Sequence, residues 1–246
     1  MKVIILAGGL GTRFGEYTKS IPKPMIKIGK HPMLIHIMKI YMKWGHKNFY
    51  LAVGYKGEKI KEYFKNFRKN GEEFDFNLSK KNCKVTILDT GLKSMTGGRL
   101  KKFKRFLSKN ENFMFTYGDG LANINLQKLK NFHLKHKNLI TVTAVHPPAR
   151  FGELIIFNKR VKFFKEKPQV KEGWINGGFF IAKKEFLNLI KKDSTILEKE
   201  PLELVTKKKQ LFAYKHSGFW KCVDTKRDKD ELDALIKKSQ KFYLKT

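Results

Sequence analysis

Short apolar runs alternate with helical patterns over the first 145 residues, and this alternation limits the folds that the chain can adopt. Between the runs, apolar residues recur every three or four positions, as in Leu34, Ile37, Met38 and Tyr41, which predicts amphipathic helices. Alternation of this kind is typical of an α/β, doubly wound, mainly parallel sheet covered on both faces. The predicted strands are Val3–Ala7, Phe49–Val53, Val85–Leu88, Phe113–Tyr117 and Ile140–Val145.

The second half of the chain shows a different pattern, in which short strand-like pieces are joined by turns. We expect a helical stretch at about Thr195–Thr206 and a final helix from about Thr225. No Ser/Gly-rich linker and no repeat separates the halves, so we predict a single domain over residues 1–246, with residues 1–145 as its core. The further strands expected are Leu154–Phe157, Val161–Glu166, Phe179–Ala182 and Leu211–Tyr214.

A glycine-rich loop follows the first predicted strand directly. Gly8, Gly9 and Gly11 lead to Arg13, and Lys23 stands between two prolines ten residues later. Glycines permit positive φ and let backbone N–H groups approach a phosphate, while the two cations supply the charge that a polyphosphate requires. Neither the Walker pattern nor the dinucleotide fingerprint fits this spacing. The loop therefore predicts a polyphosphate site of another kind.

Two aspartates are candidate ligands for a metal. Asp119, between two glycines, ends the strand at Phe113–Tyr117, and Asp224 precedes the final helix. Carboxylates are the oxygen ligands that Mg²⁺ prefers beside substrate phosphates, so the pair predicts a shared Mg²⁺. Alone, Asp119 could be an ordinary turn residue and Asp224 a helix N-cap.

Further polar residues follow predicted strands. Glu166 and Lys167 offer a carboxylate and an ammonium to a sugar phosphate, and Asn176 with Gly177 offers an amide beside a small residue. Either pair alone is a weak signal, since neighbouring Glu and Lys residues usually form a solvated face. The string from Ser94 to Arg99 precedes a predicted helix whose N-terminal amides can face an anion, and Arg99 could reach the triphosphate or the base, although simple capping by Thr96 would explain the same string.

The formal net charge of +31 requires its own interpretation. Nearly all of the excess is lysine, spread along the chain in pairs at helix-like intervals, which favours solvated helix faces over a nucleic-acid-binding surface. The two cysteines form no Cys-x-x-Cys pair, which argues against both a disulfide framework and a zinc site. No apolar run is long enough to span a bilayer and no export signal is evident, so we expect a cytoplasmic protein without a membrane or a specific nucleic-acid partner.

Taken together, these strings resemble the sugar-1-phosphate nucleotidyltransferase superfamily, and within it the glucose-1-phosphate cytidylyltransferases. The resemblance is carried by the glycine loop, Pro22-Lys23-Pro24, Ser94-Met95-Thr96-Gly97-Gly98-Arg99, Glu166-Lys167-Pro168 and Gly218-Phe219-Trp220. It implies a nucleotide-diphospho-sugar transferase (Rossmann-like) fold, with residues 1–145 binding the nucleotide and residues 146–246 the sugar. It also implies Mg²⁺, CTP, α-D-glucose 1-phosphate, a role in surface-glycan (lipopolysaccharide or capsule) biosynthesis, and a homo-oligomer, which is a hexamer in that family.

The same resemblance assigns roles to individual residues. Arg13 and Lys23 would be catalytic, and Asp119 and Asp224 would hold the metal. The sugar phosphate would be bound by Gly152, Glu166, Lys167, Asn176 and Gly177. The nucleotide would be bound by Leu6, Ala7, Gly8, Gly9, Gly11, Thr12, Arg13, Lys23, Ser94, Arg99 and Gly118.

Some alternatives remain open at this level. Uridylyl or thymidylyl transfer, or cytidylyl transfer to another hexose or heptose 1-phosphate, would use the same motifs. A protein that binds nucleic acid or another polyanion would explain the charge. Between about Phe64 and Lys84 the chain is shorter than the pattern of the cytidylyltransferases, which leaves its oligomeric state open.

Overall fold

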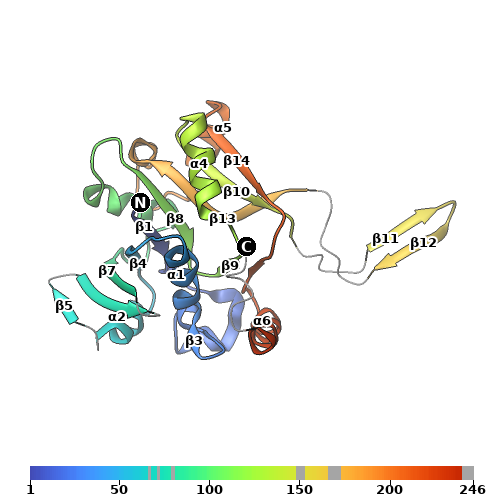
Figure 1. The fold of residues 1–246 in the computed structure, drawn as a ribbon, viewed down its shortest axis with the longest axis horizontal. Helices are drawn as coiled ribbons and strands as arrows, with labels where there is room; N and C mark the ends of the chain where they lie inside the picture. Colours follow the sequence, from blue (N-terminus) through green and yellow to red (C-terminus); the bar gives the residue numbers. More distant parts are fainter. Residues whose placement is uncertain (66–67, 71–72, 79–80, 148–152, 166–172, 240–246) are drawn as a thin grey trace.

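The computed structural model describes residues 1–65, 68–70, 73–78, 81–147, 153–165 and 173–239 (Figure 1). Its centre is a nine-stranded sheet with the order β14-β10-β13-β8-β1-β4-β7-β6-β5. The strands are β1 (Val3–Leu6), β4 (Asn48–Val53), β5 (Arg68–Asn70), β6 (Glu73–Leu78), β7 (Lys81–Asp89), β8 (Asn112–Tyr117), β10 (Ile140–Val145), β13 (Ile175–Lys183) and β14 (Leu211–His216).

The helices are α1 (Met33–Lys43), α2 (Gly57–Lys65), α3 (Thr96–Lys101), α4 (Leu126–His136), α5 (Glu200–Lys207) and α6 (Lys226–Lys238). Shorter 3-10 helices are η1 (Thr12–Lys19), η2 (Lys23–Met25), η3 (Lys102–Phe106) and η4 (Lys184–Leu189). Three two-stranded pairs complete the described parts: β2 (Lys27–Ile28) with β3 (His31–Pro32), β9 (Gly120–Ala122) with β15 (Trp220–Cys222), and β11 (Glu153–Phe157) with β12 (Arg160–Lys165).

The sheet is mainly parallel, as the sequence predicts. Seven of its nine strands run in one direction, because β13 and β6 are each antiparallel to both of their neighbours. The reversal of β13 matters for the site, since it brings the beginning of this strand to the edge at which β1 and β8 end.

Helices cover both faces of the sheet. This explains why every residue of β1 is apolar. Val3 and Ile5 pack into one core with residues of α1, α2, α4 and α6. Ile4 and Leu6 pack into a second core with residues of α3, η3, η4 and α5. Full burial of such a side chain contributes about 1.5–3 kcal/mol, so a polar residue is unfavourable at any of the four positions.

The helix expected at about Thr195–Thr206 is shorter than predicted. Residues before α5 bond to α3 instead, because the amide of Gly97 donates to the carbonyl of Thr195 and the amide of Leu197 to the hydroxyl of Thr96. The helix then begins at Glu200, with Pro201 in its first turn, where the missing amide costs nothing. The predicted start of the last helix is confirmed, since Thr225 is the N-cap of α6.

The segment from Phe64 to Lys84 extends the sheet, which the sequence analysis did not predict. In it, β6 pairs with β7 and β5 pairs with β6, both antiparallel. The signal was present, because Phe74, Phe76 and Leu78 alternate with polar residues as in a half-buried strand. Glu166, the last residue of the predicted strand Val161–Glu166, lies outside the described residues. Among the helices that the structure describes, none has the length and apolarity needed to cross a membrane.

Replacement of Gly98 tests the contact between α3 and the segment 193–199. Helix propensity alone would favour alanine by up to about 1 kcal/mol, but a Cβ at Gly98 would lie 2.1 Å from the carbonyl oxygen of Asp193. Because backbone must move, we expect Gly98→Ala to destabilise the protein by about 1–3 kcal/mol, visible as a lower Tm. Gly9→Ala is the control, since no atom lies within 4 Å of its added Cβ. Equal Tm values for the two variants would contradict this contact.

Buried histidines predict how stability depends on pH. Burial lowers the pKa of His36, His46 and His133 to about 4 in each case. Between pH 6.5 and 4 the unfolded chain therefore binds more protons than the folded chain, so stability falls as the pH falls through this range. Each group contributes a slope of up to about 1.4 kcal/mol per pH unit. Urea unfolding at pH 7, 6 and 5 measures this slope, and His36→Gln is expected to make it shallower; an unchanged slope would contradict the assignment.

Candidate active site

A cleft of about 710 Å³ opens at the edge where β1 and β8 end and β13 begins. Ligands in open α/β sheets bind beyond the carboxyl ends of the strands, which is where this cleft lies. Of the residues predicted for the site, fourteen line it: Leu6, Ala7, Gly8, Gly9, Gly11, Thr12, Lys23, Ser94, Arg99, Gly118, Asp119, Asn176, Gly177 and Asp224.

Four predicted residues cannot be placed in this cleft. Gly152, Glu166 and Lys167 lie outside the described residues. Arg13 lies in η1, and its side chain is likewise outside the described part of the structure.

The glycine loop rests on a buried arginine. The guanidinium of Arg99 donates to the carbonyl of Val53 at 3.2 Å and to the hydroxyl of Thr90 at 2.6 Å, and its side chain is only 5% exposed. A Cβ at Gly8 would overlap this guanidinium and lie 2.9 Å from the backbone nitrogen of Gly54, so a larger residue there would displace its surroundings. Gly11, with φ of 65°, then turns the chain into η1. Arg99 thus supports the glycine loop. Because Arg99 also lines the cleft, its contact with a triphosphate or base stays a prediction.

Lys23 and the two predicted metal ligands form one ion cluster. The ammonium of Lys23 lies 2.7 Å from Oδ2 of Asp119 and 2.7 Å from Oδ1 of Asp224, and its side chain is 12% exposed. Burial alone would lower the pKa of Lys23, but the carboxylate of Asp119 and the hydrogen bonds to both aspartates outweigh burial and raise the pKa. Lys23 therefore stays charged throughout the neutral range.

Backbone pairing explains how residues more than a hundred positions apart meet. In the β9–β15 pair, Cys222 stands opposite Gly120, and the amide of Val223 donates to the carbonyl of Asp119 at 2.9 Å. Asp224 follows directly. It is not the cap of α6, because Thr225 takes that role in a capping box with Asp228. The alternative role for Asp224 is therefore wrong.

The ion cluster has the donors that a divalent cation needs. The carboxylates of Asp119 and Asp224 and the thiol of Cys222 offer ligand atoms that all lie within 4.8 Å of one another. The ammonium of Lys23 already places one positive charge between the two carboxylates. The residues thus fit a divalent metal, and hard oxygen ligands beside a phosphate site suit Mg²⁺.

A second set of polar groups also lines the cleft. The amide of Asn176 donates to the hydroxyl of Tyr117 at 3.2 Å, and this hydroxyl donates to Glu198 at 2.5 Å. Thr96 donates to the other oxygen of Glu198 at 2.7 Å, so Thr96 does not cap α3. Burial, followed by the charge of Glu198, raises the pKa of Tyr117 and keeps it a hydrogen-bond donor.

The cleft residues that sequence reasoning did not assign to the site include Glu198, Trp220 and Cys222. Glu198 lies between Leu197 and a lysine, a neighbourhood typical of a solvated surface, so its role carried no local signal. Trp220 donates from Nε1 to the carbonyl of Gly177 at 2.7 Å and thereby joins β15 to β13. Cys222 also lines the cleft. Trp220 and Cys222 could have been found, because they precede Asp224 by four and two positions on an extended segment.

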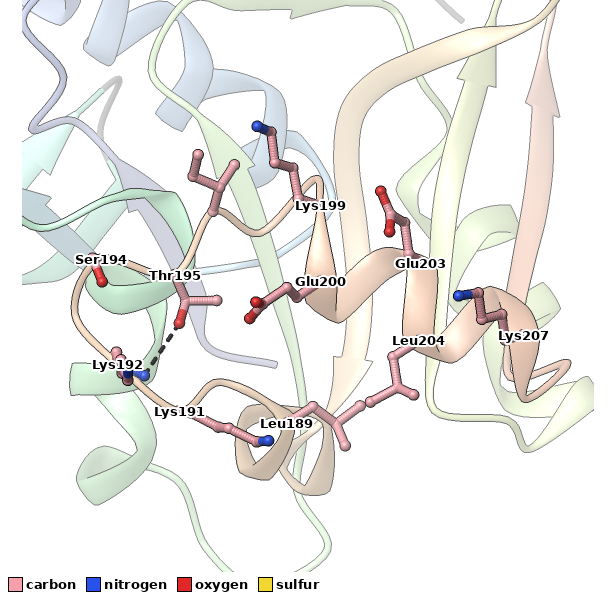
Figure 2. A pocket seen from close by; sticks show the side chains of 11 residues that line it. Leu189, Lys191, Lys192, Ser194, Thr195, Lys199, Glu200, Glu203, Leu204 and Lys207 are labelled. Carbon is pink, nitrogen blue, oxygen red and sulfur yellow. Dashed lines mark hydrogen bonds between the residues drawn. The ribbon is translucent and has the colours of Figure 1, made fainter.

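A second hollow, of about 770 Å³, lies beside η4 and α5 and is shown in Figure 2. Its lining mixes Lys191, Lys192, Lys199 and Lys207 with Glu200 and Glu203. None of the described residues predicted for the site lines it, and its lining includes no glycine and no aspartate. Ile196 borders both hollows, so the segment 193–199 is the wall between them.

Comparison with known proteins shows that the chain is similar to several sugar-1-phosphate nucleotidyltransferases. It is 43% identical to the glucose-1-phosphate cytidylyltransferase of Salmonella typhimurium, over 98% of this chain and 97% of that one. It is 31% identical to the mannose-1-phosphate guanyltransferase of Saccharomyces cerevisiae, over 96% of this chain and 64% of that one. The crystal structure of HddC from Yersinia pseudotuberculosis complexed with GMP-PN shares the fold, with a TM-score of 0.73 at 24% identity over 96% of this chain and 99% of that one.

The family model described as nucleotidyl transferase matches residues 2–238. This match includes the glycine loop, Lys23 and both aspartates, which the fold brings to one edge of the sheet. The chain belongs to the nucleotidyl transferase family, in its group of glucose-1-phosphate cytidylyltransferases.

Proposed function

We propose that the protein transfers CMP from CTP to α-D-glucose 1-phosphate, with Mg²⁺, to give CDP-glucose and pyrophosphate. The observation that supports this best is the position of Lys23 between Asp119 and Asp224, beside the glycine loop in a cleft at the sheet edge. The 43% identity to a relative named for this activity supports the choice of base and sugar.

The reaction needs no covalent intermediate on the enzyme. A phosphate oxygen of the sugar phosphate attacks the α-phosphorus of CTP in line, and the bond from that phosphorus to the pyrophosphate oxygen breaks as the new bond forms. Catalysis is then a matter of positioning and of charge neutralisation. Arg13 would hold the β- and γ-phosphates, and Lys23 would neutralise charge that develops around the α-phosphate.

The backbone of the glycine loop would contact the base. The amide of Ala7 already donates to the carbonyl of Ala52, and the carbonyl of Gly8 accepts from the amide of Tyr55. The base would therefore use other backbone groups of the loop. Leu6, Gly9, Gly11, Thr12, Ser94 and Gly118 border the same part of the cleft and would complete the nucleotide site, with Arg99 supporting it from below.

Asp119 and Asp224 would hold Mg²⁺, which when bound would neutralise charge on the substrate phosphates. Lys23 could then turn from the carboxylates toward the nucleotide, because its ammonium would no longer be needed to balance them. The same lysine could thus balance the two carboxylates in the absence of substrate and neutralise phosphate charge during transfer.

The sugar phosphate would lie against the wall formed by Asn176 and Gly177. Tyr117 and Glu198 are additional candidates for contacts with sugar hydroxyls, since both line the cleft and are hydrogen-bonded to one another. Gly152, Glu166 and Lys167 remain proposed sugar-phosphate ligands on the resemblance alone.

A homo-oligomer is also proposed. The β11–β12 hairpin stands away from the main body of the protein (Figure 1) and exposes Phe157 and Val161, at 56% and 54%. Apolar side chains on such an arm favour a contact with another subunit. We also propose a cytoplasmic location and a role in surface-glycan synthesis.

The substrate assignment predicts a pattern of pyrophosphate release. Four nucleoside triphosphates are each incubated with glucose 1-phosphate, mannose 1-phosphate and a heptose 1-phosphate. We expect CTP with glucose 1-phosphate to give the highest kcat/KM, by at least about tenfold, because one unpaired polar contact costs about 1–3 kcal/mol. Faster release from UTP or dTTP would favour the alternative transferases. Tight binding of random DNA at physiological salt, without any release, would instead favour a polyanion-binding protein.

Lys23→Ala is expected to lower turnover by about 10²–10⁴, the usual size of charge-stabilising contacts at transferring phosphates. Lys221→Ala is the matched control, because Lys221 also forms ion pairs with two carboxylates, Glu231 and Asp228, but does not line the cleft. Pyrophosphate release at saturating substrates and the Tm are measured for both variants. If both lost turnover equally, the role of Lys23 would be structural only.

A further inference from the structure

Cys222 faces the cleft because of where it lies in an extended segment. Trp220, Cys222 and Asp224 all line the cleft, as alternate residues of one strand and its extension. The residues between them point elsewhere: Lys221 pairs with Glu231, and Val223 is buried in the core at 2% exposure. The thiol is thus held on the same face as the metal-ligand candidate two residues later.

The surroundings of this thiol are those of a metal ligand. Its sulfur lies within 4.8 Å of one carboxylate oxygen of Asp119 and one of Asp224. Its cross-strand partner is Gly120, which has no side chain that could separate the thiol from the cleft. The second cysteine, Cys83, is buried in the core on β7 and does not line the cleft.

A thiolate changes which cation such a centre prefers. Mg²⁺ takes oxygen ligands and keeps its waters, so it would use the two carboxylates and leave the sulfur aside. Zn²⁺ and Co²⁺ accept sulfur together with oxygen, and three protein ligands with one open position is a common arrangement for zinc. We propose that Cys222 is a third ligand, through which Asp119, Asp224 and Cys222 bind a thiophilic divalent cation such as Zn²⁺ in competition with Mg²⁺.

This inference rests on the proposed metal centre and deepens it. On binding, the thiol loses its proton to the solvent and the sulfur forms the bond to the metal. The two carboxylates, the thiolate and the cation together carry one negative charge, which the neighbouring ammonium of Lys23 can balance. The site would then hold a cation in the absence of nucleotide, and Zn²⁺ would compete with the Mg²⁺ that the reaction uses.

Cobalt absorption tests the sulfur ligand without measuring turnover. Co²⁺ is added to the purified protein, and we expect the near-ultraviolet charge-transfer absorption of a cobalt–thiolate bond. Cys222→Ser is expected to remove this absorption and to weaken Zn²⁺ binding by at least about tenfold, while Mg²⁺ binding changes less than about threefold. Cys83→Ala is the control and should keep the absorption.

The possible outcomes distinguish a failure of the proposed role of Cys222 from a failure of the proposed metal centre. If Co²⁺ binds without thiolate absorption, and Asp224→Asn abolishes that binding, the carboxylate centre stands and the role of Cys222 is wrong. If the wild-type protein binds neither Co²⁺, Zn²⁺ nor Mg²⁺, both are wrong. Absorption that survives in Cys222→Ser but disappears in Cys83→Ala would also overturn the inference, because it would assign the thiolate to the other cysteine.

Discussion

Burial of the central strand β1 on both faces is the constraint on which the rest of the structure depends. Its four residues fill two separate cores, so helices must cover each face and the strand cannot carry polar side chains. Residues that bind ligands are thereby restricted to the edge of the sheet, where the strands end and the chain continues into loops. The glycine loop, Asp119 and the beginning of β13 meet at this edge because β1, β8 and β13 are adjacent in the sheet.

At that edge, the arrangement is governed by charge balance. Two carboxylates placed close together repel one another unless a cation lies between them, and the ammonium of Lys23 supplies that charge at 2.7 Å from each. Removing one partner of such a cluster leaves an unbalanced, half-buried charge. Under the proposed function, the same geometry would accept a divalent cation, and the ammonium of Lys23 would then be available to a phosphate.

Rigid support lies behind the residues that face the cleft. Arg99 holds the underside of the glycine loop through bonds to Val53 and Thr90, and the segment 193–199 is bound to α3 through close backbone contacts at Gly97 and Gly98. Glu198 reaches Tyr117 only because that segment is fixed. Cys222 needs no such support, because the alternation of side chains along an extended strand places its thiol within 4.8 Å of carboxylate oxygens of Asp119 and Asp224.

The sequence by itself determined the α/β class, the positions of most strands, and the local motifs, because periodicity and glycine-rich turns depend on neighbours in the chain. It also indicated Asp119 and Asp224 as a pair of metal ligands and Lys23 as a phosphate-binding residue. Only the tertiary structure decided that β13 runs antiparallel, that Arg99 is buried beneath the loop, that Thr225 rather than Asp224 caps α6, and that Glu198 and Cys222 enter the cleft. These outcomes depend on contacts between residues far apart in the chain, and no local pattern encodes such contacts.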